Sequence, residues 1–288
     1  MAGWWDIFRS IIYGIVEGIT EWLPVSSTGH LILLEEWMPL AQSSEYFSMY
    51  LVVIQLGAIM AVVVTYWHRM WPFALQTGPV STLEQNKPKK RIAVKSEIIV
   101  MWLKILVACI PAAVIGVFFD DHIDRLFYNP WVVAAALIIV GIIFILVENW
   151  IKGSSPSIVK MEGISWRIAF AIGLFQVISA VFPGVSRSGA TIIGGLILGL
   201  SRTLAAEFTF YMAVPVMLGA SFLKLLTYEG DWNLLNILVL LTGMAVAFLV
   251  SLKIIEFLMN YIRRNNFKPF GYYRIALGLL VILFFSFA

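Results

Sequence analysis

Charged residues and cysteines are scarce in this chain. Charged residues make up 13 % of its 288 positions and hydrophobic residues make up 60 %, whereas a soluble domain carries about 25 % charged residues. The single cysteine, Cys109, excludes an intramolecular disulfide and speaks against a cysteine-rich metal site. The net charge of +3 is too small and too scattered to predict nucleic acid as a partner. Together with a mean hydropathy of +0.89, this composition predicts a protein of the lipid bilayer.

The hydrophobic residues fall into segments of the length that a membrane requires. A transmembrane helix needs about 20 mostly apolar residues. Six stretches qualify: 47–67, 98–119, 131–150, 204–227, 233–260 and 269–287. Two further hydrophobic regions, 4–38 and 165–200, are broken by proline within polar stretches, and broken helices occur at membrane depth when protein buries them. We therefore predict an all-α polytopic membrane protein, a single membrane domain over 1–288, with six transmembrane helices and two re-entrant helical hairpins.

The charges of the loops predict an orientation. Cytoplasmic loops carry an excess of lysine and arginine, and such an excess occurs in loops 69–97, 151–164 and 263–268. Acidic residues at 120–124 and 229–231 mark the loops of the outer face. Six spans then leave both termini outside. The first hairpin enters the membrane from the outer face and the second from the inner face.

Short sequence matches relate the two halves of the chain. The matching pairs are VSSTG at 25–29 with VSRSG at 185–189, FxxY at 47–50 with 208–211, and LGA at 56–58 with 218–220. Together with the opposite entry of the two hairpins, they predict an inverted-topology repeat, with repeat one over about 1–119 and repeat two over about 131–288. The binding sites of such repeats lie near the midplane, where the broken helices meet. We therefore expect the two polar stretches to form one site.

The first polar stretch combines acids, hydroxyls and an imidazole. Glu17 and Glu21 are four residues apart, so on a helix they share one face, where a divalent cation or a cationic partner would relieve their repulsion. The alternative places both carboxylates in water at a helix end. His30 follows Ser27 by three residues and could act as a general base toward its hydroxyl, or as a general acid toward a leaving group. A histidine without a role at a wet helix end is the alternative for His30.

The second polar stretch contributes a fixed positive charge. Arg187 lies between two serines and cannot easily reach water, so it needs a buried anion, and a phosphate or a carboxylate suits its planar fork. A purely structural pairing with Glu17 or Glu21 is the main alternative. Both polar stretches also read as helix N-termini, which present free N–H groups to an anion. The two stretches together predict a phosphate-binding site.

At four strings the chain resembles the undecaprenyl-diphosphatase family, also called bacitracin-resistance proteins. The strings are EGITEWLPVSSTGHL at 17–31, VVIQLGAI at 52–59, PGVSRSGAT at 183–191 and SRTLAAEFTF at 201–210. The resemblance covers essentially the whole chain. It implies a bacterial inner-membrane enzyme that hydrolyses a C55 polyprenyl diphosphate to the monophosphate, recycles the lipid carrier of cell-wall synthesis and confers bacitracin resistance. It also implies dependence on a divalent cation, which we expect to be Mg²⁺ or Ca²⁺ on Glu17 and Glu21, and an active site that opens to the periplasm, the side on which the loop charges place both termini.

The family's functional residues map onto this sequence. The implied catalytic residues are Ser27, His30, Glu21 and Arg187, the substrate-binding residues are Ser26, Thr28, Ser186, Ser188 and Thr191, and the metal ligands are Glu17 and Glu21. Either Ser27 or an activated water is the nucleophile, and a homodimer is left open. The alternative function is a secondary transporter or lipid flippase, because inverted repeats with broken helices are also typical of transporters.

Overall fold

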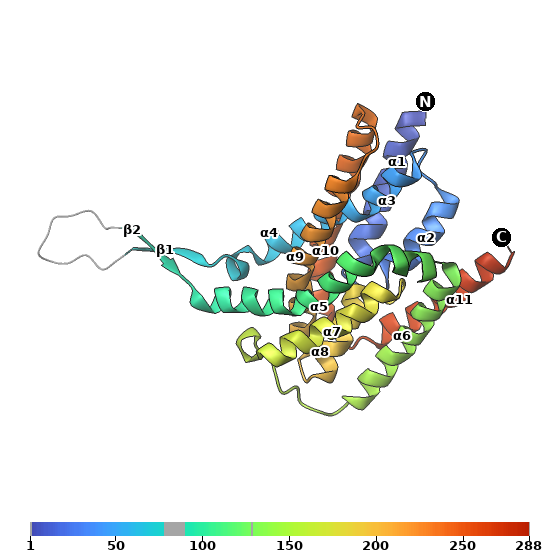
Figure 1. Cartoon of the computed structure of the whole chain (residues 1–288). Coiled ribbons are helices and arrows are strands. Elements are labelled where there is room, and N and C mark those ends of the chain that lie inside the picture. The colour runs from blue at the N-terminus through green and yellow to red at the C-terminus, as the bar shows by residue number, and fades with distance from the viewer. Residues whose placement is uncertain (1, 78–89, 128, 288) are drawn as a thin grey trace, which may run out of the picture.

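The computed structural model describes residues 2–77, 90–127 and 129–287, and helices dominate them (Figure 1). The helices are α1 (Ala2–Thr20), α2 (Ser27–Trp37), α3 (Ser44–Val53), α4 (Gln55–Met70), α5 (Ser96–Phe127), α6 (Pro130–Trp150), α7 (Trp166–Val181), α8 (Arg187–Ile197), α9 (Arg202–Thr227), α10 (Leu234–Ile262) and α11 (Lys268–Phe287), with a 3-10 turn, η1, at Met161–Gly163. Among the described residues, six segments are long and apolar enough to cross a membrane. They coincide with the six predicted spans, the first formed by α3 and α4 together, which confirms a multi-pass membrane protein.

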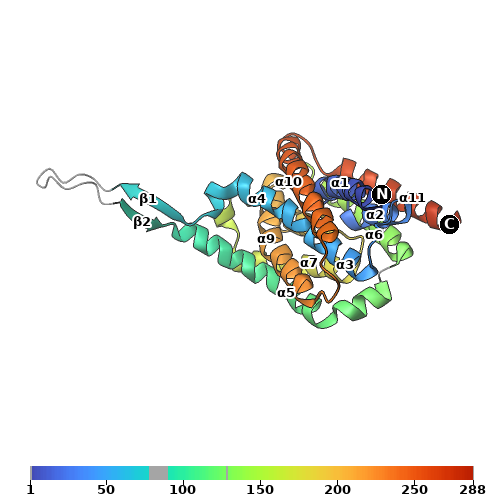
Figure 2. The ribbon, with the colours of Figure 1, turned by 90° about the horizontal axis from the view of Figure 1, so that it is seen from above.

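A short two-stranded ladder interrupts the helical fold. Strands β1 (Phe73–Thr77) and β2 (Lys90–Val94) pair antiparallel, with Phe73 opposite Val94. The ladder projects from the helical body between α4 and α5 (Figure 2). The sequence predicts only a basic loop here, because strands of five residues give a weak hydrophobic pattern.

Both predicted helix breaks are present. Helix α1 ends at Thr20 and α2 begins at Ser27, so Pro24 lies in the turn between them. Helix α7 ends at Val181 and α8 begins at Arg187, which places Pro183 in the second turn. Proline lacks a backbone N–H and disfavours helical geometry at the preceding residue. Each helix therefore ends before its proline, as the sequence predicts.

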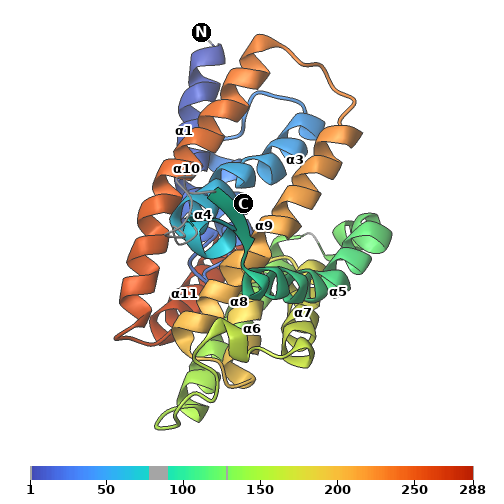
Figure 3. The same cartoon turned by 90° about the vertical axis from the view of Figure 1, so that its left-hand side faces the viewer.

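The long helices pack in pairs that draw on both halves of the chain. Helix α1 runs along α10, α7 runs along α5, and α6 runs along α11. Figure 3 shows α1 and α10 side by side. In the α6–α11 pair the backbones touch reciprocally: a Cβ on Gly141 would lie 2.7 Å from Gly271 O, and a Cβ on Gly271 would lie 2.7 Å from Gly141 O. Helices α2 and α8 both contact α6.

The buried residues form a core around the two broken helices, and the outside is apolar. Trp22, Phe144, Phe208 and Phe210 are almost fully buried in the largest cluster. Long runs of leucine, isoleucine, valine and phenylalanine remain exposed on α5, α9, α10 and α11. An apolar exterior of this kind suits the hydrocarbon core of a bilayer. Because lipid offers no hydrogen bonds, the buried polar groups must find their partners inside the bundle.

Candidate active site

The two turns have the same backbone. Ser26 is the N-cap of α2 with φ of 74°, and Ser186 is the N-cap of α8 with φ of 70°. Among the described residues these are the only non-glycine residues with positive φ. The hydroxyl of Ser26 accepts from Gly29 N at 3.4 Å, and that of Ser186 accepts from Gly189 N at 3.1 Å. Such strained backbone costs about 1–3 kcal/mol per residue and concentrates at functional sites.

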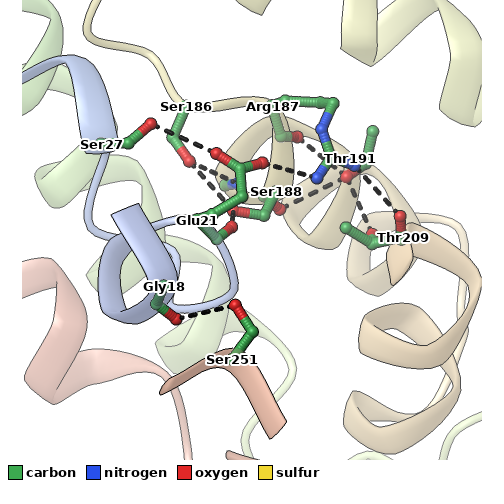
Figure 4. A network of polar contacts seen from close by, with 10 residues as sticks. Gly18, Glu21, Ser27, Ser186, Arg187, Ser188, Thr191, Thr209 and Ser251 are labelled. Atoms are coloured by element: carbon green, nitrogen blue, oxygen red, sulfur yellow. Dashed lines mark hydrogen bonds and ion pairs between the residues drawn. The ribbon is translucent and has the colours of Figure 1, made fainter. Parts of the chain in front are cut away.

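The turns meet at Glu21, as the sequence predicts (Figure 4). Arg187 Nη2 donates to Glu21 Oε1 at 2.7 Å, and Ser27 Oγ donates to Glu21 Oε2 at 3.2 Å. Ser188 Oγ donates to the Glu21 carbonyl at 3.1 Å. One carboxylate therefore joins the hydroxyl of the first turn to the guanidinium of the second.

Arg187 is nearly enclosed by protein. Its side chain is 13 % exposed, its Nη1 donates to Thr209 O at 3.1 Å, and its Nε is buried without a hydrogen-bond partner among the described residues. The ion pair with Glu21 is the structural pairing that the sequence offers as the alternative to phosphate binding. A guanidinium has five donors, so a buried N–H without a partner leaves capacity for a further acceptor.

Hydroxyl groups of α8 and α9 form hydrogen bonds next to the second turn. Thr191 Oγ1 donates to Arg187 O at 2.9 Å and accepts from Thr209 Oγ1 at 2.8 Å, and Thr191 is 1 % exposed. The hydroxyls of Ser186 and Ser188 lie 3.1 Å apart. Thr191 thus fixes the start of α8 against α9.

His30 is held by groups other than Ser27. Its Nδ1 lies 2.7 Å from Ser26 O, and its Nε2 lies 2.7 Å from the Tyr273 hydroxyl. The His30 and Tyr273 rings stack with their centroids 5.6 Å apart. Because a carbonyl can only accept, Nδ1 carries a proton, and in the neutral ring Nε2 then accepts from Tyr273. The group within hydrogen-bonding distance of Ser27 is Glu21, so the predicted His30–Ser27 contact is replaced by a Glu21–Ser27 contact in this structure.

Glu17 is buried, and its carboxylate has no hydrogen-bond partner in the described part of the chain. It is 0 % exposed, and both carboxylate oxygens lack a hydrogen-bond partner among the described residues. Glu21, one turn further along, is 7 % exposed. The alternative of two carboxylates in water at a helix end is therefore wrong. The described residues contain no group of three or more His, Cys, Asp or Glu side chains placed to hold a metal ion.

The third contributor to the site, α11, is one that the sequence does not predict. Tyr273 contacts His30, and Arg274, which is 0 % exposed, donates to Pro24 O, Gly184 O and Val185 O. An arginine within a predicted span is itself a signal of function. Arg274, however, lies near the start of the predicted span, where an arginine is typical of an anchor at the membrane interface, so the sequence does not distinguish it as a site residue.

The chain is similar to known proteins over nearly its whole length. A family model described as bacitracin resistance protein BacA matches residues 10–280. A protein of Desulfitobacterium hafniense named undecaprenyl-diphosphatase is 53 % identical over 281 residues, which cover 98 % of this chain and 96 % of the relative. Proteins of the same name from Acetivibrio thermocellus and Enterococcus faecalis are 51 % and 49 % identical over 280 and 278 residues, covering 97 % and 96 % of this chain and 98 % and 96 % of each relative. This chain belongs to the bacitracin resistance protein BacA family.

Proposed function

We propose that the junction of the two turns is the active site at which this protein hydrolyses undecaprenyl diphosphate to undecaprenyl phosphate and inorganic phosphate. The relatives carry the name undecaprenyl-diphosphatase at about half identity over nearly the whole chain. The observation that carries the proposal is the contact of Arg187 and Ser27 with the two oxygens of Glu21. The cation for phosphate and the hydroxyl thereby each lie within hydrogen-bonding distance of the carboxylate base.

Phosphate binding would fall to Arg187 and the two helix N-termini. Helices α2 and α8 begin at the junction, at Ser27 and Arg187, and a helix N-terminus favours an anion. An incoming phosphate would take the place of the Glu21 carboxylate on Arg187, because a bidentate phosphate satisfies the same fork. Ser26, Thr28, Ser186 and Ser188 would supply further hydrogen bonds around it, and Thr191 would support the α8 turn.

Release from Arg187 would leave Glu21 free to act as a base. Ser27 Oγ would then bond to the terminal phosphorus as the bond to the bridging oxygen breaks, and its proton would pass to Glu21. Undecaprenyl phosphate leaves with the bonding electron pair. Water hydrolyses the phosphoserine and regenerates Ser27. A water activated by Glu21 in the place of Ser27 would give the same products in one step.

His30 and Tyr273 would handle protons at the mouth of the site. Both side chains are partly exposed, and they are joined by one hydrogen bond. His30 lies one turn along α2 from Ser27, and Tyr273 contacts it from α11. We assign His30, when it is protonated at Nε2, to proton donation toward the leaving oxygen, with Tyr273 orienting the ring; a positioned acid contributes about 100- to 10,000-fold.

The two glutamates fit a divalent cation. The partnerless oxygens of Glu17 are of the ligand type that Mg²⁺ and Ca²⁺ prefer, and Glu21 lies one turn away. When bound, such an ion would offset the charge of the diphosphate. These two residues leave most ligand positions to water and to substrate oxygens, as is usual for Mg²⁺ at phosphate sites.

The helix pairing supports an inverted repeat with two re-entrant hairpins. Helix α1 packs on α10 and α7 packs on α5, so the broken helix of each half lies against a span of the other. The reciprocal contact of Gly141 and Gly271 relates α6 to α11 in the same way. We therefore extend repeat one through α6 and begin repeat two at α7. With the charge-derived orientation, both termini and the site face the periplasm of a bacterial inner membrane.

Phosphate release tests the function directly. Purified protein in detergent should release inorganic phosphate from undecaprenyl diphosphate, and chelation of divalent cations should suppress the release. A transporter or flippase would bind the lipid and release none. Phosphate release that chelator leaves unchanged would remove the cation from the proposal while leaving the hydrolysis in place.

A further inference from the structure

Among the residues that the structure describes, Arg274 is a buried cation without a carboxylate partner. It projects from α11 and is 0 % exposed. Its three hydrogen bonds within the described parts of the chain go to backbone carbonyls: Nη1 to Pro24 O at 3.2 Å, and Nη2 to Gly184 O at 2.7 Å and to Val185 O at 2.9 Å. Burying a cation without a counter-ion costs free energy. The hydrogen bonds to the three carbonyls must therefore offset part of the cost of burying Arg274.

The three acceptors belong to the two catalytic turns. Pro24 lies two residues before the N-cap Ser26, and Val185 immediately precedes the N-cap Ser186. These carbonyls lie outside the helices, where the regular helical ladder supplies no N–H, and buried carbonyls without a donor are destabilising. A single planar guanidinium therefore satisfies both turns and joins them.

The rest of the second turn leaves little room for adjustment. Gly184 has φ of 92°, and a Cβ at this position would lie 2.7 Å from Val133 O, so backbone packing fixes one side of the turn. On its other side, a Cβ on Gly189 would lie 3.2 Å from Arg274 Nη1. The guanidinium is thus wedged between the turns rather than extended into open space.

The first half of the molecule has no counterpart of this arginine. The reciprocal contact of Gly141 and Gly271 makes these two positions equivalent, so three residues further on Phe144 is the counterpart of Arg274. Phe144 is also fully buried, and a Cβ on Gly189 would lie 3.5 Å from its ring. One arginine, from one side only, holds both turns.

We propose that Arg274 is a positioning residue that sets the spacing of the two turns, so that Ser27 and Arg187 act on the same phosphate. The proposal rests on the proposed function, since it gives Arg274 a part in that hydrolysis. Arg274 touches no reacting atom; it acts through the backbone that carries the N-caps of α2 and α8. A shift of about 1 Å in a reacting group can cost about 100-fold in rate.

Arg274→Lys tests the proposal, because lysine keeps the charge but lacks the planar fork that spans two turns. We expect kcat for phosphate release to fall about 100-fold, with KM changing less than about threefold, because binding groups remain and their alignment is lost. Arg274→Gln is the second variant: its neutral amide removes the buried charge and can donate to one turn only, and it should show the same split between kcat and KM.

Arg202→Lys is the matched control. Arg202 Nε donates to Glu148 Oε1 at 2.9 Å, and the same oxygen accepts from Phe267 N at 2.9 Å, so this arginine also joins three elements but away from the turns. We expect Arg202→Lys to lower the melting temperature about as much as Arg274→Lys does while kcat stays within about twofold of wild type.

The outcomes separate the two proposals. If wild-type protein releases no phosphate, the proposed function fails. If wild type releases phosphate and both Arg274 variants keep wild-type kcat, only the positioning role fails. It also fails if kcat falls equally in Arg202→Lys, or if neither Arg274 variant folds while Arg202→Lys does, because Arg274 would then serve folding alone.

Discussion

Arg187 and Glu21 lie in different halves of the chain and form a buried ion pair, with Arg187 Nη2 2.7 Å from Glu21 Oε1. The other oxygen of the same carboxylate accepts from Ser27. An isolated pair of this kind stabilises little, because removing two charges from water offsets their attraction. The proposed roles explain the pair better: Arg187 would bind the incoming phosphate, and Glu21 would then accept the proton of Ser27.

Ser27→Ala should abolish formation of a covalent intermediate. We expect kcat to fall about 1,000-fold, because the hydroxyl that Glu21 activates is removed. Acid quenching during turnover, followed by mass spectrometry, should find phosphate on Ser27 of the wild type. Ser221→Ala is the control, since Ser221 is another buried hydroxyl, bonded to Val52 O at 3.1 Å, and its loss should leave kcat within about twofold. Turnover by Ser27→Ala near the wild-type level would assign the attack to water.

Glu17→Gln should weaken the response to divalent cation. The carboxylate of Glu17 is buried and its oxygens have no partner among the described residues, so the proposed divalent cation would balance its charge. We expect the Mg²⁺ concentration for half-maximal phosphate release to rise at least about tenfold, because removal of a supporting ligand group typically costs about 10- to 100-fold in metal affinity. Glu207→Gln is the control, because Glu207 pairs with Arg69 away from the turns. An unchanged Mg²⁺ dependence in Glu17→Gln would contradict this ligand assignment.

Tyr273→Phe should slow turnover without removing the aromatic stack on His30. The variant loses the hydroxyl that lies 2.7 Å from His30 Nε2 and keeps the ring. We expect kcat to fall about tenfold, less than the roughly 100- to 10,000-fold contribution of a proton-transfer group, since His30 itself remains. Tyr272→Phe removes a hydroxyl from the neighbouring residue, which is 59 % exposed, and should leave kcat unchanged. Equal rates for both variants would show that His30 works without Tyr273.

Local signals predict most of the fold. Hydropathy alone predicts a span at 131–150, and α6 covers Pro130–Trp150; it predicts 269–287, and α11 covers Lys268–Phe287. Proline predicts both helix breaks because its chemistry acts at its own position. The β1–β2 ladder is not predicted, because pairing between strands depends on partners that a short apolar pattern does not specify.

The site is predicted in its residues and only partly in its contacts. Glu21, Ser27 and Arg187 lie in polar stretches between apolar runs, and the repeat indicates that these stretches meet. The partner of His30 is not predicted, because Tyr273 lies 243 residues away in the sequence. The role of Arg274 is not predicted either, since its acceptors are backbone carbonyls, which have no sequence signature.

The central claim is that Arg187 from one turn and the glutamate and serine of the other form a single diphosphate site. The most direct test is phosphate release from undecaprenyl diphosphate by purified Arg187→Ala, beside wild type and the control Arg69→Ala. Arg69 also pairs with a glutamate, but its side chain is 68 % exposed and it lies away from the turns. We predict that Arg187→Ala loses about 1,000-fold in kcat/KM, as expected when a charged group that stabilises the transition state is removed, while Arg69→Ala stays within about twofold of wild type. Wild-type kcat/KM in a folded Arg187→Ala protein would contradict the claim.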